Sequence, residues 1–141
     1  MDPTNDDADV SAAQRYLDDM VARRGYVLDY HKVMAANDLP VLQAADALVQ
    51  AAYLAPRRLD GRTKELLFIL SLTVLRSEKS HIQSHIRVGL KLGLTAEEIL
   101  EAIEIALPEA GVVAFQWGVD AWREVVQPEG IEPSPGILPS S

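Results

Sequence analysis

The chain has 141 residues, about half of them hydrophobic and few of them aromatic, which suits one mostly helical domain with a single core. Its net charge of −8, with lysines and arginines scattered along the sequence, argues against nucleic acid or an anionic membrane surface as a partner. The absence of cysteine excludes disulfides, thiolate metal sites and thiol catalysis.

No segment has the pattern of a membrane span or a signal peptide. The longest nearly apolar run, residues 66–75, is far shorter than the roughly 20 residues that a membrane-spanning helix needs. The N-terminus shows no basic start followed by an apolar stretch. We therefore expect a cytoplasmic protein.

The first part of the chain predicts a flexible acidic start at residues 1–8, followed by three helices. The first helix covers residues 9–24 and ends at Gly25, and the second covers residues 27–36. The third covers residues 40–54, with a proline in its first turn, where the missing N–H group does no harm.

A fourth helix is predicted over residues 61–76, with Asp60 as its N-cap. This helix is apolar nearly all round over residues 66–75, so neighbouring helices or another subunit should bury it. A strand is the competing interpretation of the apolar run. We favour the helix because nothing nearby could pair with a strand.

A fifth helix is predicted over residues 78–93, with Gly93 as its C-terminal stop. Thr95 and Glu98 then have the spacing of a capping box, which predicts the start of a sixth helix. This helix should run to Leu107.

Pro108 and Gly111 interrupt the sixth helix, and a seventh is predicted over residues 112–126. Residues 127–141 form a tail rich in proline, in which no helix should persist. The sequence thus predicts one all-helical domain over residues 9–126.

Two histidines in the fifth helix, His81 and His85, lie one helical turn apart. The polar stripe of this helix consists of Lys79, Gln83, Arg87 and Lys91. Both histidines lie about 200° round from this stripe, so they should face the core. Glu65 shares a face of the fourth helix with Ile69 and Leu72, so it should face inward too. A carboxylate beside an inward imidazole fixes the tautomer of the ring, and together they can act as a general acid–base pair.

These residues also have structural interpretations. Glu65 lies near the start of its helix, where the helix dipole favours a negative charge, and an inward histidine is more often a satisfied core residue than a catalyst. The i, i+4 spacing of the histidines is also that of metal ligands. A third ligand would have to come from Glu65, Glu104, Glu109 or His31. Nothing in the sequence singles one out, so we predict no metal site.

The stretches LDGRTKELLFILSL and SHIQSHIRVGLKLGLTAEEILEAIEIALPEAGVVAFQWGVDAWREV resemble the carboxymuconolactone decarboxylase and alkylhydroperoxidase D (AhpD)-like family. The resemblance covers about residues 59–126, and more faintly the helices from residue 39. Its landmarks are the glutamate of KEL, the histidine and arginine of HIR, the glycine before TAEEI, and ALPEAG. It implies an all-α, AhpD-like subunit of about six or seven helices with a central antiparallel helix hairpin, assembled into a trimer or hexamer.

The peroxidase branch of this family carries a C-x-x-C motif ahead of its histidine. Counting back from His85, the two cysteine positions fall on Glu78 and His81, and the chain has no cysteine. Peroxide reduction by that thiol mechanism is therefore excluded. The decarboxylase branch lacks the redox pair and keeps the histidine, which matches His85. The chain departs from that branch at His81, where a glutamate is more common, and in a turn that is one residue longer.

The resemblance implies a cofactor-independent carboxy-lyase that acts on a carboxylated lactone or a related small acid. We predict His85 as proton donor or enolate stabiliser, with His81 or Glu65 as its relay partner. Arg87 either anchors a substrate carboxylate beside a neighbouring subunit or is a plain surface residue. His31 either lines the pocket mouth, where it would contact substrate, or is solvated. The alternatives are an isomerase, hydrolase or cyclase of a lactone or β-keto acid, and a non-catalytic oligomeric binding protein.

Overall fold

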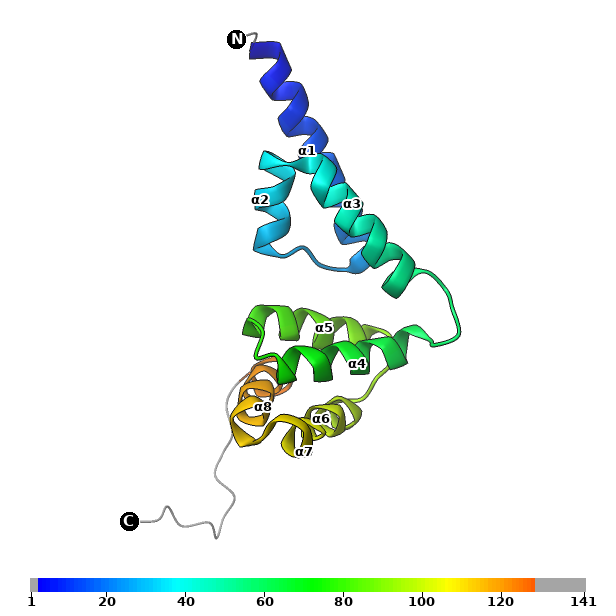
Figure 1. Cartoon of the computed structure of the whole chain (residues 1–141), viewed down its shortest axis with the longest axis vertical. Coiled ribbons are helices and arrows are strands. Elements are labelled where there is room, and N and C mark those ends of the chain that lie inside the picture. The colour runs from blue at the N-terminus through cyan, green and yellow to red at the C-terminus, as the bar shows by residue number, and fades with distance from the viewer. Residues whose placement is uncertain (1–2, 129–141) are drawn as a thin grey trace, which may run out of the picture. The chain divides into compact units, whose positions relative to one another are not determined.

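The structure, a computed structural model, describes residues 3–128, with side chains from residue 12 onward (Figure 1). All regular elements in this range are helices, as the sequence predicts. In the described part of the chain, no helix is both long and apolar enough to cross a membrane. The predicted proline-rich tail lies outside the described residues from residue 129 onward.

The chain divides into two compact units, Met1–Lys64 and Glu65–Ser141, where the sequence predicts a single domain. Each unit has its own cluster of buried apolar side chains, which is the physical basis of the division. The core of the first unit consists of Met20, Ala35 and Leu42. The core of the second consists of Ile69, Leu72, Ile82, Ile86, Leu94, Ile99, Ile103 and Ala121.

The first unit contains α1 (Pro3–Arg24), α2 (Asp29–Asn37), α3 (Leu39–Val49) and the π-helix η1 (Gln50–Leu54). The third predicted helix therefore ends in a π-helical turn. Residues 3–8, for which the sequence predicts a flexible start, lie in α1. Nothing in this segment breaks a helix once Pro3 has begun it, and its acidic residues suit the positive end of the helix dipole.

The helix ends of the first unit follow local chemistry. Gly25 ends α1 with a φ of 87°, which glycine adopts at little cost. α2 begins at Asp29 rather than at residue 27. The reason is that Nδ1 of His31 accepts the backbone N–H of Leu28 at 3.0 Å and so caps the helix with a side chain.

The second unit contains most of α4 (Gly61–Val74), whose first turn falls in the first unit, followed by four further helices. These are α5 (Lys79–Lys91), α6 (Ala96–Glu104), α7 (Ala106–Ala110) and α8 (Val112–Val126). α4 and α5 lie side by side as an antiparallel hairpin, and α8 packs against α5, α6 and α7 (Figure 1). The hairpin is the element that positions the candidate site.

The predicted caps of α4 and α6 are confirmed. The Asp60 carboxylate accepts the backbone N–H of Thr63 at 2.8 Å. Thr95 and Glu98 each accept the other's backbone N–H at 3.0 Å. Gly93 has the expected positive φ, 97°, after the end of α5.

The sixth predicted helix does not run unbroken to Leu107. α6 ends at Glu104, and the short α7 follows it. The ring of Pro108 clashes with a carbonyl four residues earlier and cannot donate a hydrogen bond to it, so a continuous helix is broken at that point. Gly111, with a φ of 90°, then ends α7 and leads into α8.

Within the second unit, one face of α4 is buried. Its buried residues are Glu65, Ile69, Leu72 and Thr73. Leu67 of α4 is 49% exposed, and Leu75, the residue after the end of α4, is 75% exposed. Burial of these side chains by another subunit stays a prediction.

Gly118 allows α8 to approach α4 closely. A Cβ atom at this position would lie 2.5 Å from Cγ2 of Thr73 and 2.9 Å from Cγ2 of Ile103. Both neighbours are β-branched and fully buried, so they have little room to move. We expect Gly118→Ala to lower the free energy of unfolding by about 1–3 kcal/mol in urea denaturation. Gln116→Ala, at an exposed position of the same helix, should change it by less than about 0.5 kcal/mol. Equal urea midpoints for the two variants would contradict the prediction.

Candidate active site

The predicted catalytic residues Glu65 and His85 meet between α4 and α5. Nδ1 of His85 lies 2.8 Å from Oε2 of Glu65, and each side chain is only 1% exposed. When Glu65 is ionised, its carboxylate accepts the Nδ1 proton, which leaves Nε2 as the basic nitrogen of the neutral ring. The contact therefore fixes the tautomer of His85.

Helix periodicity places these two residues on facing buried surfaces. Glu65 lies one turn before Ile69 on the buried face of α4. His85 lies between Ile82 and Gly89 on the buried face of α5. A Cβ atom at Gly89 would lie 3.0 Å from Cδ1 of Leu94 and 3.8 Å from Cβ of Glu65, so a side chain here would crowd Leu94 and contact Glu65. The helical repeats of α4 and α5 thus place the Glu65 and His85 side chains on buried faces, where they contact each other.

Phe68 belongs to the site, and the sequence analysis missed it. Its ring stacks on the His85 ring, with centroids 4.5 Å apart and planes 6° from parallel. The stack restrains the imidazole and covers one of its faces with apolar surface. The sequence did contain a signal for this contact, because Phe68 is the only aromatic residue of α4 and lies one turn after Glu65, on the same side of the helix.

His81 extends the site toward the surface of the second unit. Its ring is half-buried, and its centroid lies 5.3 Å from that of His85. Nδ1 of His81 lies 3.4 Å from the Ser77 hydroxyl. Burial lowers the pKa of His81 below its ordinary 6.5, and repulsion from His85 lowers it further. His81 is therefore neutral at neutral pH and can accept a proton.

The other two predicted site residues are Arg87 and His31. Arg87 is exposed on α5, two positions after His85 and so on another side of the helix. His31 belongs to the first unit, where it is only 1% exposed and its ring contacts Tyr30 at a centroid distance of 4.1 Å. Of the two alternatives for His31, the solvated one is wrong, because the ring is buried and its Nδ1 caps α2. Contact between His31 and a substrate stays a prediction.

Among the described residues, no group of three or more His, Cys, Asp or Glu side chains could hold a metal ion. Glu104 and Glu109, considered above as third ligands, are exposed on α6 and α7.

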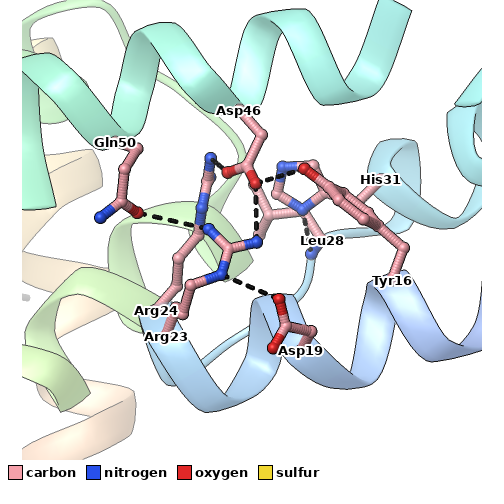
Figure 2. Close-up of polar contacts among 8 residues, drawn as sticks. All are labelled: Tyr16, Asp19, Arg23, Arg24, Leu28, His31, Asp46 and Gln50. Atoms are coloured by element: carbon pink, nitrogen blue, oxygen red, sulfur yellow. Dashed lines mark hydrogen bonds and ion pairs between the residues drawn. The ribbon is translucent and has the colours of Figure 1, made fainter. Parts of the chain in front are cut away.

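The first unit contains a buried polar network that the sequence analysis also missed. Asp46, 3% exposed, accepts hydrogen bonds from the Tyr16 hydroxyl at 2.6 Å and the Arg23 guanidinium at 2.8 Å, and it pairs with the Arg24 guanidinium (Figure 2). The full network consists of Tyr16, Asp19, Arg23, Arg24, Asp46 and Gln50. Asp46 lies one turn after the buried Leu42, so its inward position could have been read from helical spacing.

The charge of Asp46 is strongly stabilised. Burial alone would raise its pKa, but hydrogen bonds from Tyr16, Arg23 and Arg24 outweigh this effect and lower the pKa from 3.8 to about 2. The carboxylate therefore stays ionised and serves as the counter-charge of the buried Arg24 side chain, which is 5% exposed. This network stabilises the packing of α1 against α3.

The model of the carboxymuconolactone decarboxylase family matches residues 40–124, more than half of the chain. The match contains Glu65, Phe68, His81 and His85. It confirms the family resemblance and, with the helices described above, the all-α AhpD-like fold. No curated protein and no solved structure gives a significant match to the chain.

Proposed function

Because the chain belongs to the carboxymuconolactone decarboxylase family, we propose that it is a cofactor-independent decarboxylase of a carboxylated lactone or a related small acid. The observation that carries the proposal is the buried contact between Glu65 and His85, with the half-buried His81 beside it. The chain has no thiol, so the peroxidase chemistry of the family's other branch is excluded.

The reaction breaks the bond between the carboxylate carbon and the lactone ring. The electron pair left behind delocalises into the double bond and carbonyl of the lactone, which acts as the electron sink. One proton then adds to carbon, so the reaction uses one carboxylate and one proton and releases carbon dioxide. The protein has to stabilise the developing enolate and deliver that proton in a place shielded from water.

His85 supplies the proton from Nε2 in this proposal. Glu65 accepts the Nδ1 proton and stabilises the imidazolium form, which makes it a positioning residue. Phe68 keeps water from one face of the ring. His81, held neutral by its lowered pKa, passes a proton from solvent back to His85 after each turnover.

We also propose that the chain acts in the cytoplasm as a trimer or hexamer. Large apolar side chains that are exposed in the single chain support self-association, among them Leu75 at 75% and Val113 at 64%. In such an assembly Arg87, exposed on α5, would bind a substrate carboxylate beside a neighbouring subunit.

The proposal predicts that the purified chain releases carbon dioxide from γ-carboxymuconolactone. We expect one carbon dioxide per lactone consumed and, in D₂O, one carbon-bound deuterium in the product. The control is the same lactone with heat-denatured protein. Consumption of the lactone without carbon dioxide release would favour an isomerase or hydrolase and contradict decarboxylation.

A further inference from the structure

A cationic surface cavity of about 530 Å³, open to solvent, lies in the first unit along the loop that leads from η1 to α4. Its walls consist of Ala52, Arg57, Arg58, Leu59 and Lys64. Three of these residues are cations and none is acidic, in a chain whose net charge is −8. The cations are therefore not evenly scattered, because four of the chain's 13 lysines and arginines fall within residues 57–64.

The one acidic residue of this loop does not neutralise the cavity. Asp60 does not line it, and the Asp60 carboxylate accepts the backbone N–H of Thr63 as the N-cap of α4. This hydrogen bond, with a smaller contribution from Arg62, lowers the pKa of Asp60. The Asp60 carboxylate therefore caps the N-terminus of α4.

The cations of the cavity are available to a ligand. Neither Arg57 nor Arg58 forms a hydrogen bond or an ion pair with any residue whose side chain the structure describes. Lys64 is held in place because its ammonium donates to the carbonyls of Tyr53 at 3.1 Å and Ala55 at 3.4 Å. Two of its three N–H groups are used in this way, and the third can bind a ligand.

We propose that this cavity binds a small dicarboxylate, with Arg57 and Arg58 pairing with one carboxylate and Lys64 with the other. Guanidinium groups match the planar geometry of a carboxylate, and the Lys64 ammonium adds a third positive charge that its hydrogen bonds hold in place. Ala52 and Leu59 provide apolar surface for the carbon chain between the two charges. The inference concerns residues 52–64 and does not depend on the proposed reaction.

Isothermal titration of the full chain with glutarate tests this inference. Glutarate offers no electron sink for decarboxylation, so its binding is measured without turnover, whatever reaction the chain catalyses. We expect one site per chain, with pentanoate, which has the same carbon chain and one carboxylate, binding at least about tenfold more weakly.

The matched variants are Arg57→Gln/Arg58→Gln and Arg15→Gln, the latter at an exposed arginine of α1. The double variant should weaken glutarate binding by at least about tenfold, because it loses charge-assisted hydrogen bonds, whereas Arg15→Gln should bind as the parent does. Both arginines of the double variant are exposed, so circular dichroism should show a parent-like fold. The inference is overturned if the parent binds no glutarate at millimolar concentrations, if the double variant binds as tightly as the parent, or if inorganic phosphate binds more tightly than glutarate.

Discussion

Replacing His85 by glutamine should lower kcat for carbon dioxide release by about 10²- to 10⁴-fold, the contribution typical of a positioned general acid. Glutamine keeps an amide N–H that can still donate to Glu65, so the buried carboxylate retains a partner. It cannot deliver a proton to carbon at neutral pH. The loss should therefore appear in the chemical step rather than in folding, which a thermal melt by circular dichroism checks.

Two further variants separate chemistry from structure at this site. Glu65→Gln should lower kcat while leaving KM nearly unchanged, because in the proposed mechanism Glu65 acts through the His85 ring and does not contact the substrate. Lys91→Gln, at an exposed position of α5, should behave as the parent chain. A parent-like kcat for His85→Gln would remove His85 from the mechanism.

Replacing Asp46 by asparagine should lower the free energy of unfolding by about 3–5 kcal/mol, since it leaves the Arg24 guanidinium buried without its counter-charge. Because asparagine and aspartate have nearly the same shape, the loss of stability would come from the missing charge and not from altered packing. Tyr16 and Arg23 would also lose a charged acceptor. Urea denaturation followed by far-UV circular dichroism measures the change as a lower midpoint.

The control for this prediction is the same substitution at Asp29. The Asp29 carboxylate is fully exposed and reaches Lys32 only at 3.9 Å, so Asp29→Asn should cost less than about 1 kcal/mol. Equal urea midpoints for Asp46→Asn and Asp29→Asn would contradict the prediction that the polar network around Asp46 stabilises the fold.

The pH dependence of stability gives a second measure of Asp46. Its pKa is about 2 in the folded chain against 3.8 ordinarily, so the unfolded chain binds more protons between these values. The stabilisation, about 2 kcal/mol at 1.36 kcal/mol per pKa unit, is present above pH 4 and is lost as the pH falls toward 2. Asp46→Asn should lack this acid-dependent loss.

Helix boundaries set by local chemistry could be predicted from the sequence. The seventh predicted helix matches α8, Val112–Val126, and the capping box of Thr95 and Glu98 forms as expected. These features depend on residues within one or two turns of each other. The sequence predicts that the sixth helix reaches Leu107, whereas α6 already ends at Glu104, because a proline disturbs the helical turn ahead of it.

The inward direction of Glu65 and His85 was also determined by the sequence, since the helical repeat alone decides which residues share a face. Only the tertiary structure decided that Nδ1 of His85 meets Oε2 of Glu65 at 2.8 Å and that Phe68 stacks on the ring. The same holds for the pairing of Asp46 with Arg24, which lie 22 residues apart. Such contacts depend on how separate helices pack, and a helical repeat carries no information about the rotation and offset of one helix against another.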